Sequence, residues 1–528
     1  MQKILILLLA FPIIVFGQTS WIHCDSSFSI NINSQNSIEV VYSVSGPNLN
    51  VNSNPSWVYF NMLGSCIGGS SYNSQTDTVN INNNLPDSTA IMCLITDSLS
   101  SCIVIDTLVY DSFTGWSMTS NSSSSTQTYV PDDNFESYLE ANGMGNGVPN
   151  DDYVTTANIN TITYLPINTL AISNLTGIED FSNLEELLCY DNNLSTLNLN
   201  QNINLKDLSC GSNNLTSLLI DSCLNLEYIS CPNNFLTSLD VSNNFVLNEL
   251  RCYQNNLTTL DLSNNTNLIE VQCGDNYLSY LNTNNCSSLV VLNCSNNLLT
   301  AINLISNTSL RDLYCYNNNL DSLNIISNTL IERIYCQDNS LTQIDASNNI
   351  FLQHLQCYTN NITQLDLTNC NFLENLHCGS NQINSLDVTN NPYLKNLTCD
   401  NNNLTSLDIS NNTYLEDLYC EVNNIDSLDL TNNINLDGLN CGDNNLTFLD
   451  LRNGNNSLIT SYTSWGNPHL YCVNVDDTSW SYIHWTSIDS WTVFSTQCNY
   501  EKTYVPDDNF ENYLESNNMG DGVFNNDS

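Results

Sequence analysis

Basic residues are scarce in this chain of 528 residues, which has 8 Lys and Arg against 54 Asp and Glu and a net charge of −46. Such an acidic chain repels nucleic acid and anionic membranes, so neither is expected as a partner. Long apolar runs are missing after the first 17 residues, so no membrane span is expected. The motifs of hydrolases, zinc peptidases and phosphate-binding loops are also missing, and we expect no enzyme activity.

Residues 1–17 have the pattern of a secretory signal. Lys3 precedes an apolar run over residues 4–16, and Gly17 stands before the expected cleavage point. No Cys follows that point, so a lipid anchor is not expected. The sequence therefore predicts an exported protein, secreted or at the cell surface, in a compartment that permits disulfides.

Cysteine recurs every 21 residues, thirteen times, from Cys189 to Cys441, with no insertion or deletion. A fixed period of this length indicates a solenoid in which each repeat is one turn. Within one unit, Leu397 and Cys399 are two residues apart and face the same side of a short strand. An apolar pair further along the unit, Leu407 and Ile409 in this repeat, predicts a second short strand.

Asparagine marks the two turns of each unit. The residue three after every ladder Cys is Asn, and a second Asn site follows the Cys by thirteen residues. A buried Asn bonds backbone groups that a tight turn leaves without partners, which predicts two Asn ladders along the solenoid. Cys223, Cys286 and Cys370 fall on the second site, where we expect them to replace Asn.

The unit resembles the leucine-rich repeat family, in its bacterial secreted 21-residue subclass with the consensus LxxLxCxxNxLxxLDLxxNxx. The resemblance covers thirteen regular repeats over residues 184–454. It implies a mostly-β solenoid with a parallel sheet on one face and a second short strand in place of a helix. It also implies an amino-terminal cap with a degenerate first repeat at 128–183 and a carboxy-terminal cap at 455–499.

The remaining segments are predicted from pattern. Residues 18–120 are rich in strand patterns and weakly resemble PKD-like or Ig-like β-sandwich modules, and 121–127 form a polar linker. A short cap helix is expected to begin at Pro131 or Asp132 and to stop at Gly143. Residues 500–528 repeat the start of this cap, so we expect a second capped array to open there.

The cysteines fall into three groups. Ladder neighbours on adjacent strands would be ~4.8 Å apart with parallel Cβ vectors, whereas a disulfide needs Cβ atoms at ~3.8 Å, which predicts free buried thiols. Cys472 and Cys498 bracket the carboxy-terminal cap and are expected to form a disulfide. Four further cysteines allow three pairings, which stay open: Cys24, Cys66, Cys93 and Cys102.

The strand positions at −3, −1 and +1 from each ladder Cys point away from the core and are rich in Tyr and Arg, the residues that dominate binding hot spots. The candidate ligand-binding residues are Arg251, Tyr253, Tyr314, Tyr316, Arg333, Tyr335, His354, Gln356, Tyr358, His377 and Tyr419. This predicts non-covalent recognition of a protein or a surface glycan. Alternatively, Tyr merely suits an exposed strand, and the array is a structural spacer or the carrier of an enzyme domain encoded further on.

A second polar ladder lies nine residues after the Cys. Its members are Asp240, Asp261, Asp345, Asp366, Asp387, Asp408, Asp429 and Asp450. Stacked carboxylates repel one another, and either local hydrogen bonds to Ser and Thr or bound Ca²⁺ would relieve this. The last six members are the calcium candidates, and no other cofactor is expected.

Overall fold

The computed structural model of the protein describes residues 126–498 and 507–516, together with strands between residues 26 and 118. The chain divides into two units, Met1–Ser124 and Ser125–Ser528. The strands of the first unit form two antiparallel sheets, in the orders β1-β2-β5 and β4-β3-β6-β7-β8. Their bounds are β1 Ser26–Ser34, β2 Ser37–Val44, β3 Ser56–Phe60, β4 Cys66–Ser71, β5 Thr76–Asn80, β6 Ala90–Thr96, β7 Ile103–Asp111 and β8 Gly115–Met118.

Several predictions for the amino-terminal part concern features outside the described residues. These are the signal at 1–17, most of the linker at 121–127, and the side chains of its four cysteines. The packing of the two sheets as a sandwich therefore stays a prediction.

The second unit is a solenoid built on a 15-stranded parallel sheet, the main sheet. Its strands are three residues long, and from β12 to β31 they pair in a register of 21 residues, as in Asp312↔Arg333. In order they are β11 Tyr164–Pro166, β12 Glu186–Leu188, β14 Asp207–Ser209, β16 Tyr228–Ser230, β17 Glu249–Arg251, β19 Glu270–Gln272, β21 Val291–Asn293, β22 Asp312–Tyr314, β23 Arg333–Tyr335, β25 His354–Gln356, β27 Asn375–His377, β28 Asn396–Thr398, β29 Asp417–Tyr419, β31 Gly438–Asn440 and β33 Ser461–Thr463.

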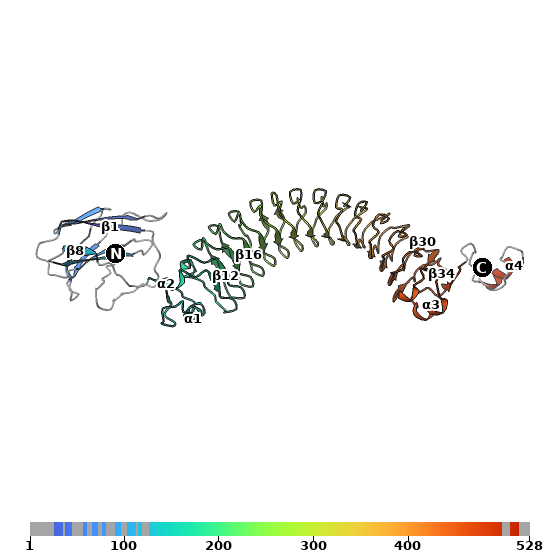
Figure 1. The fold of residues 1–528 in the computed structure, drawn as a ribbon, viewed down its shortest axis with the longest axis horizontal. Helices are drawn as coiled ribbons and strands as arrows, with labels where there is room; N and C mark the ends of the chain where they lie inside the picture. The colour runs from blue at the N-terminus through green and yellow to red at the C-terminus, as the bar shows by residue number, and fades with distance from the viewer. Residues whose placement is uncertain are drawn as a thin grey trace. The chain divides into compact units, whose positions relative to one another are not determined.

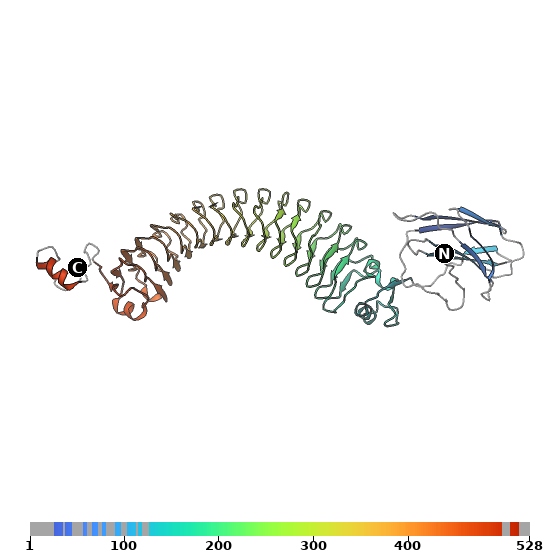
Figure 2. The same ribbon diagram turned by 180° about the vertical axis from the view of Figure 1, so that it is seen from behind.

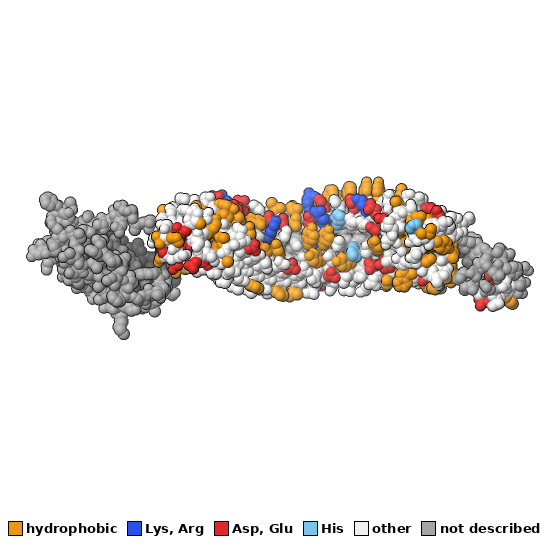
Figure 3. Space-filling view, turned by 90° about the horizontal axis from the view of Figure 1, so that it is seen from below, with side chains coloured by type: hydrophobic (Ala, Val, Ile, Leu, Met, Phe, Trp, Pro, Cys, Tyr) orange, Lys and Arg blue, Asp and Glu red, His pale blue; other side chains and the backbone are white. Residues whose placement is uncertain are grey.

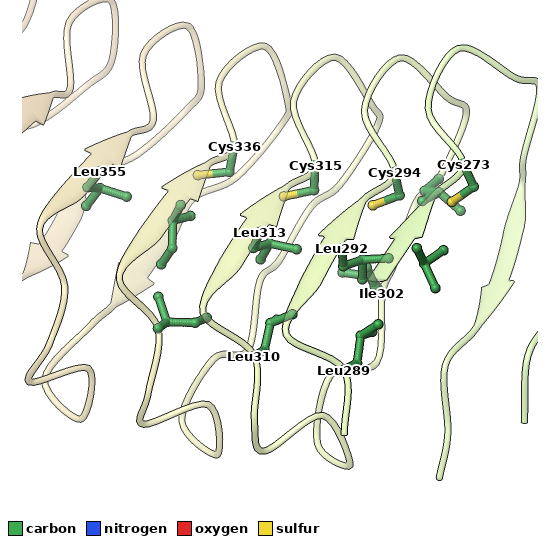
Figure 4. Close-up of a cluster of buried hydrophobic side chains, with 14 of the residues drawn as sticks. Cys273, Leu289, Leu292, Cys294, Ile302, Leu310, Leu313, Cys315, Cys336 and Leu355 are labelled. Atoms are coloured by element: carbon green, nitrogen blue, oxygen red, sulfur yellow. The ribbon is translucent and has the colours of Figure 1, made fainter. Parts of the chain in front are cut away.

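The core is a stack of Leu, Ile, Val and Cys side chains that runs the length of the solenoid. Each ladder Cys directly follows a main-sheet strand, and all thirteen are fully buried and free. Figure 4 shows Cys273, Cys294, Cys315 and Cys336 in one row beside Leu292 and Leu313. The thiols thus act as small apolar side chains, as expected from their spacing.

The first Asn ladder fastens each repeat to the one before it. Asn318 Nδ2 donates to the carbonyls of Cys294 and Cys315 at 3.0 and 3.2 Å, and its Oδ1 accepts from Leu299 N–H at 3.0 Å. The residue before this Asn is left-handed in all thirteen repeats, with φ between 49° and 55°. The turn therefore depends on a strained backbone that the Asn side chain holds in place.

The second Asn ladder uses mainly its donors, and only Asn307 among its described members also accepts a bond, from Thr283 Oγ1 at 2.9 Å. Asn328 Nδ2 donates to the carbonyls of Leu304 and Asn307 at 3.0 and 2.7 Å, while its buried Oδ1 has no partner. A thiol can therefore take this position, because it too can donate. Three cysteines do so: Cys223, Cys286 and Cys370 donate to the carbonyls of Leu199, Leu262 and Ala346 at 3.1, 3.3 and 3.3 Å.

The second strand of the unit is intermittent, which corrects the prediction of two strands in every turn. Within the described solenoid, the strands on this side are β13 Thr196–Asn198, β15 Ser217–Leu219, β18 Thr259–Asp261, β20 Tyr280–Asn282, β24 Gln343–Asp345, β26 Gln364–Asp366, β30 Ser427–Asp429 and β32 Phe448–Asp450. Figures 1 and 2 show the repeats stacked in an arc with the main sheet on its inner side. Because the outer side of an arc is longer, the repeats there separate too far for an unbroken ladder of backbone bonds.

The amino-terminal cap comprises β9 Gln127–Tyr129, α1 Asp133–Ala141, β10 Tyr153–Thr155, α2 Thr156–Ile159 and the 3₁₀ turn Ile178–Asp180. Asp132 is the N-cap of α1, and its Oδ1 accepts from the N–H groups of Asn134 and Phe135, both at 3.1 Å. Its Oδ2 accepts from Ser173 N–H at 2.8 Å, which ties the helix to the first turn of the solenoid. These bonds hold the pKa of Asp132 below its ordinary value, although burial opposes them.

The carboxy-terminal cap comprises the 3₁₀ turn Asn456–Leu458, β34 Cys472–Asn474, α3 Thr478–His484 and β35 Val493–Ser495. The structure contains the expected disulfide between Cys472 and Cys498. Trp485 is buried and stacks on Tyr462 with ring centroids 4.4 Å apart. In the duplicated segment, α4 Asp508–Ser516 is capped by its preceding Asp as α1 is.

Candidate functional site

Eight of the candidate residues lie together on four adjacent strands of the main sheet, β22, β23, β25 and β27, or two residues after the end of one of them. The register places Tyr314, Tyr335, Gln356 and His377 side by side in one row. Asp312, Arg333, His354 and Asn375 form the parallel row two residues earlier. Tyr316 and Tyr358 follow the ladder Cys of their own repeats. We call this block of residues the concave site.

Two tyrosines and an arginine organise its amino-terminal half. The rings of Tyr314 and Tyr335 stack with centroids 5.0 Å apart and planes 7° apart. Arg333 Nε and Nη2 donate to the two carboxylate oxygens of Asp312 at 2.5 and 3.0 Å. This paired geometry raises the pKa of Arg333 and keeps its guanidinium in place beside the rings.

Two histidines organise the other half. Tyr358 stacks on His377 with ring centroids 4.2 Å apart. Asn375 Nδ2 lies 3.0 Å from His354 Nδ1. Burial lowers the pKa of both His354 and His377, so both rings are neutral at pH 7.

The fold does not require aromatic side chains in these rows. Other strands of the same sheet carry Ser, Asn or Thr at the position of Tyr314, for example Ser230, Asn293 and Thr398, with the same register. Figure 3 views the inner side of the arc and shows basic, His and hydrophobic side chains gathered in its middle. Most candidates are half-buried rather than fully exposed, because neighbouring strands crowd their side chains.

Three candidates lie away from the concave site. Arg251 and Tyr253 belong to a repeat three turns earlier, where Arg251 lies 5.8 Å from the ring centroid of Tyr228. Tyr419 lies two strands beyond β27, and its hydroxyl donates to Asp417 at 3.2 Å. The sequence analysis missed the partners Asp312, Tyr228 and Asn375. All three lie three residues before a ladder Cys, a position that the repeat register identifies from the sequence alone.

Among solved structures, the chain is similar to the functional domain of InlJ from Listeria monocytogenes, which is described as including a cysteine ladder. The two are 32% identical with a TM-score of 0.59, over 68% of this chain and 78% of that one. This chain belongs to the leucine-rich repeat family. The internalin InlF from Listeria monocytogenes (22% identity, TM-score 0.47, 70% and 96% covered) and YopM from Yersinia enterocolitica (23%, 0.47, 56% and 67%) are also similar. No protein-family profile matches the sequence. No curated protein matches it either.

In this leucine-rich repeat protein the ladder thiols face the core, away from the concave site. Burial raises the pKa of Cys189 to about 12 and that of Cys315 well above its ordinary value. His377 faces outward, whereas Cys378 is buried in the core, so these neighbours do not form a Cys–His pair.

The Asp ladder makes local turns. The Oδ1 atom of Asp387 accepts from the N–H and hydroxyl of Thr389 at 2.9 and 2.6 Å. Asp345, Asp366, Asp408 and Asp429 make the same pair of bonds with the Ser or Thr two residues on. These bonds lower the pKa of Asp345, Asp387 and Asp408. Asp450 instead accepts from Arg452 and Asn474.

Among the described residues, one group of carboxylates is close enough to hold a metal, and it does not include the Asp ladder. It comprises Asp133, Glu136 and Asp152 in the amino-terminal cap, with ligand atoms within 4.8 Å of one another. Both oxygens of the buried Glu136 already accept backbone N–H groups, from Asp151 and Asp152 at 3.1 and 3.2 Å. The arrangement therefore fastens α1 to the loop that follows it. Among the described residues, no helix has the length and apolarity needed to cross a membrane.

Proposed function

We propose that this protein is an exported or cell-surface binding protein whose concave site recognises a protein or a surface glycan. The observation that supports this is the stack of Tyr314 on Tyr335 beside a fixed Arg333. Other repeats form the same strands without aromatic residues, so the rings are not needed for the fold.

The chemistry of the site suits recognition. Stacked rings lose little conformational freedom on binding, and a guanidinium held by a carboxylate is already oriented for a ligand. The neutral rings of His354 and His377 add hydrogen-bonding groups without charge. Curved solenoids present such groups on an extended inner surface that can contact a large ligand.

The test is a binding screen of the whole chain on protein and glycan arrays, followed by affinity measurements on each hit. We expect Tyr314→Ala/Tyr335→Ala to weaken binding at least tenfold, because hot-spot tyrosines each contribute more than about 1 kcal/mol. Tyr280→Ala is the matched control, since Tyr280 is exposed on the other side of the repeat. Undiminished affinity of the double variant for every hit would refute the proposal.

A screen that yields no hit in either array would favour the alternative of a structural spacer. Calcium binding by Asp345 and the other members of the Asp ladder also remains a proposal. Calorimetric titration tests it, and the absence of heat at millimolar Ca²⁺ would remove it.

A further inference from the structure

Four consecutive repeats carry an exposed aromatic residue at the same position, fifteen after the ladder Cys. They are Phe351, Phe372, Tyr393 and Tyr414, with 42%, 51%, 47% and 50% of their surface exposed. Phe372 and Tyr393 stack with centroids 6.2 Å apart, and the rings of Tyr393 and Tyr414 are tilted by 32° with centroids 5.8 Å apart. We call these four residues the aromatic rail. They precede the main-sheet strands, so the rail borders the concave face without belonging to the concave site.

The fold does not need aromatic residues at this position. Asn204, Asn225, Asn267 and Asn435 occupy it in other repeats, and each Nδ2 donates to a carbonyl of the preceding repeat at 2.9 to 3.4 Å. A Phe or Tyr cannot make that bond. The four rail repeats thus exchange a bond between repeats for exposed apolar surface.

The rail has the size of a functional patch. Four half-exposed rings offer about 400 Å² of mostly apolar surface, the size of the largest patch on many monomeric proteins. Figure 3 shows a row of hydrophobic side chains along the upper margin of the inner face. Phe372 and Tyr393 stack with their planes 5° apart, so each of these two rings turns one face toward the other and its edge outward. Sugars stack on ring faces, so ring edges fit the apolar side chains of a protein better.

The charges beside the rail are mainly negative. Three members of the rail are each followed, two residues later, by a charged residue: Glu374, Lys395 and Glu416. Lys395 Nζ pairs with Glu374 at 2.8 Å, and the two further carboxylates, Glu416 and Asp437 of the next repeat, leave an excess of negative charge. A second copy of this chain would bring a net charge of −46 of its own, so self-association through the rail is disfavoured.

We propose that the aromatic rail binds a basic amphipathic segment of a partner protein. Its apolar side chains would pack on the ring edges, and its Lys or Arg residues would face Glu416 and Asp437. The spacing of about 6 Å between rings is close to the 5.4 Å pitch of an α-helix, so one helical turn would match one repeat. This site is separate from the concave site and goes beyond the function proposed above.

The probe is a fluorescent 18-residue peptide of Leu and Lys with Leu at positions i, i+3, i+4 and i+7, titrated against the whole chain. The test variant is Phe372→Asn/Tyr393→Asn, which restores the residue of other repeats and keeps the net charge. We expect at least tenfold weaker binding of the peptide to this variant. Tyr280→Asn is the matched control and should bind like the unmodified chain.

A second peptide, with Ser in place of Leu, has the same charge and should bind the rail variant and the unmodified chain equally. Equal affinity of the Leu/Lys peptide for both proteins would overturn the proposal. Three other results would also overturn it. One is equally tight binding of a Leu/Glu peptide. The others are self-association in sedimentation velocity, or binding of a soluble β-glucan, that the unmodified chain shows and the rail variant loses. The Tyr314→Ala/Tyr335→Ala variant should keep its affinity for the peptide, which separates this test from that of the concave site.

Discussion

The two Asn ladders differ in what they bond, and this predicts different costs for the same substitution. In the described structure the buried Leu299 N–H donates only to Asn318 Oδ1, and Asn318→Cys removes this acceptor. An orphaned buried N–H costs about 1–3 kcal/mol, and the lost donor bonds add about 1 kcal/mol. The expected loss in the free energy of unfolding is therefore about 2–4 kcal/mol.

Asn328→Cys should cost about 1 kcal/mol or less. The carbonyls of Leu304 and Asn307 each keep a backbone donor, from Asn307 and Leu310 at 3.0 and 3.1 Å. The thiol can donate to one of them, as Cys223 does, and the partnerless Oδ1 disappears. Because the change in side-chain volume is identical in both variants, the difference isolates the role of the acceptor.

The assay is urea unfolding of the reduced chain followed by far-UV circular dichroism, with amide exchange of Leu299 as a local readout. We expect Leu299 to exchange faster in Asn318→Cys and at the unmodified rate in Asn328→Cys. Equal losses of stability in the two variants, or a larger loss for Asn328→Cys, would refute the reasoning.

Three further predictions follow from the same repeats. Val422 is a β-branched residue held at φ 55°, so Val422→Asn should stabilise the chain by about 1 kcal/mol in urea unfolding, and no gain would contradict the assigned strain. Burial lowers the pKa of His354 and His377 below the ordinary ~6.5, so the unfolded chain binds more protons between the two values. The contribution of the neutral rings to the free energy of unfolding is therefore complete above pH ~6.5 and falls as the pH drops. The variant His354→Gln/His377→Gln should show a flatter dependence of the free energy of unfolding on pH below this value. An unchanged slope would contradict the role of the two histidines. The ladder thiols, such as Cys315, should resist iodoacetamide at pH 8 until urea unfolds the chain, as peptide mapping by mass spectrometry would show; rapid labelling of the native chain would contradict their burial.

The 21-residue period was enough to predict the architecture of the repeats. It identified the inward side of each strand, the bonding role of both Asn sites and the replacement of Asn by Cys223 at the second. The family assignment follows from the similarity to the InlJ domain, which shares a cysteine ladder. These features depend on contacts inside one repeat or between neighbours, which a strict period reveals.

The features that the sequence analysis missed depend on geometry across the arc. The second strand loses its pairing in several repeats because curvature sets the spacing on the outer side, and a constant period contains no information on curvature. The pairing of Arg333 with Asp312 depends on side-chain rotamers. The aromatic rail was visible in principle, because Phe372 and Tyr393 align once the repeats are stacked, but their exposure had to come from the structure.

Each side chain of the first Asn ladder bonds only its own repeat and the one before it, as Asn213 does with Cys210 and Cys189. A whole repeat outside the concave site can therefore be lost or duplicated without leaving an Asn of this ladder unmatched. Every such event would move the concave site by one strand spacing, ~4.8 Å, relative to a cap. Loss or gain of a repeat outside the concave site would thus change its distance from a cap in fixed increments and leave its own residues unchanged.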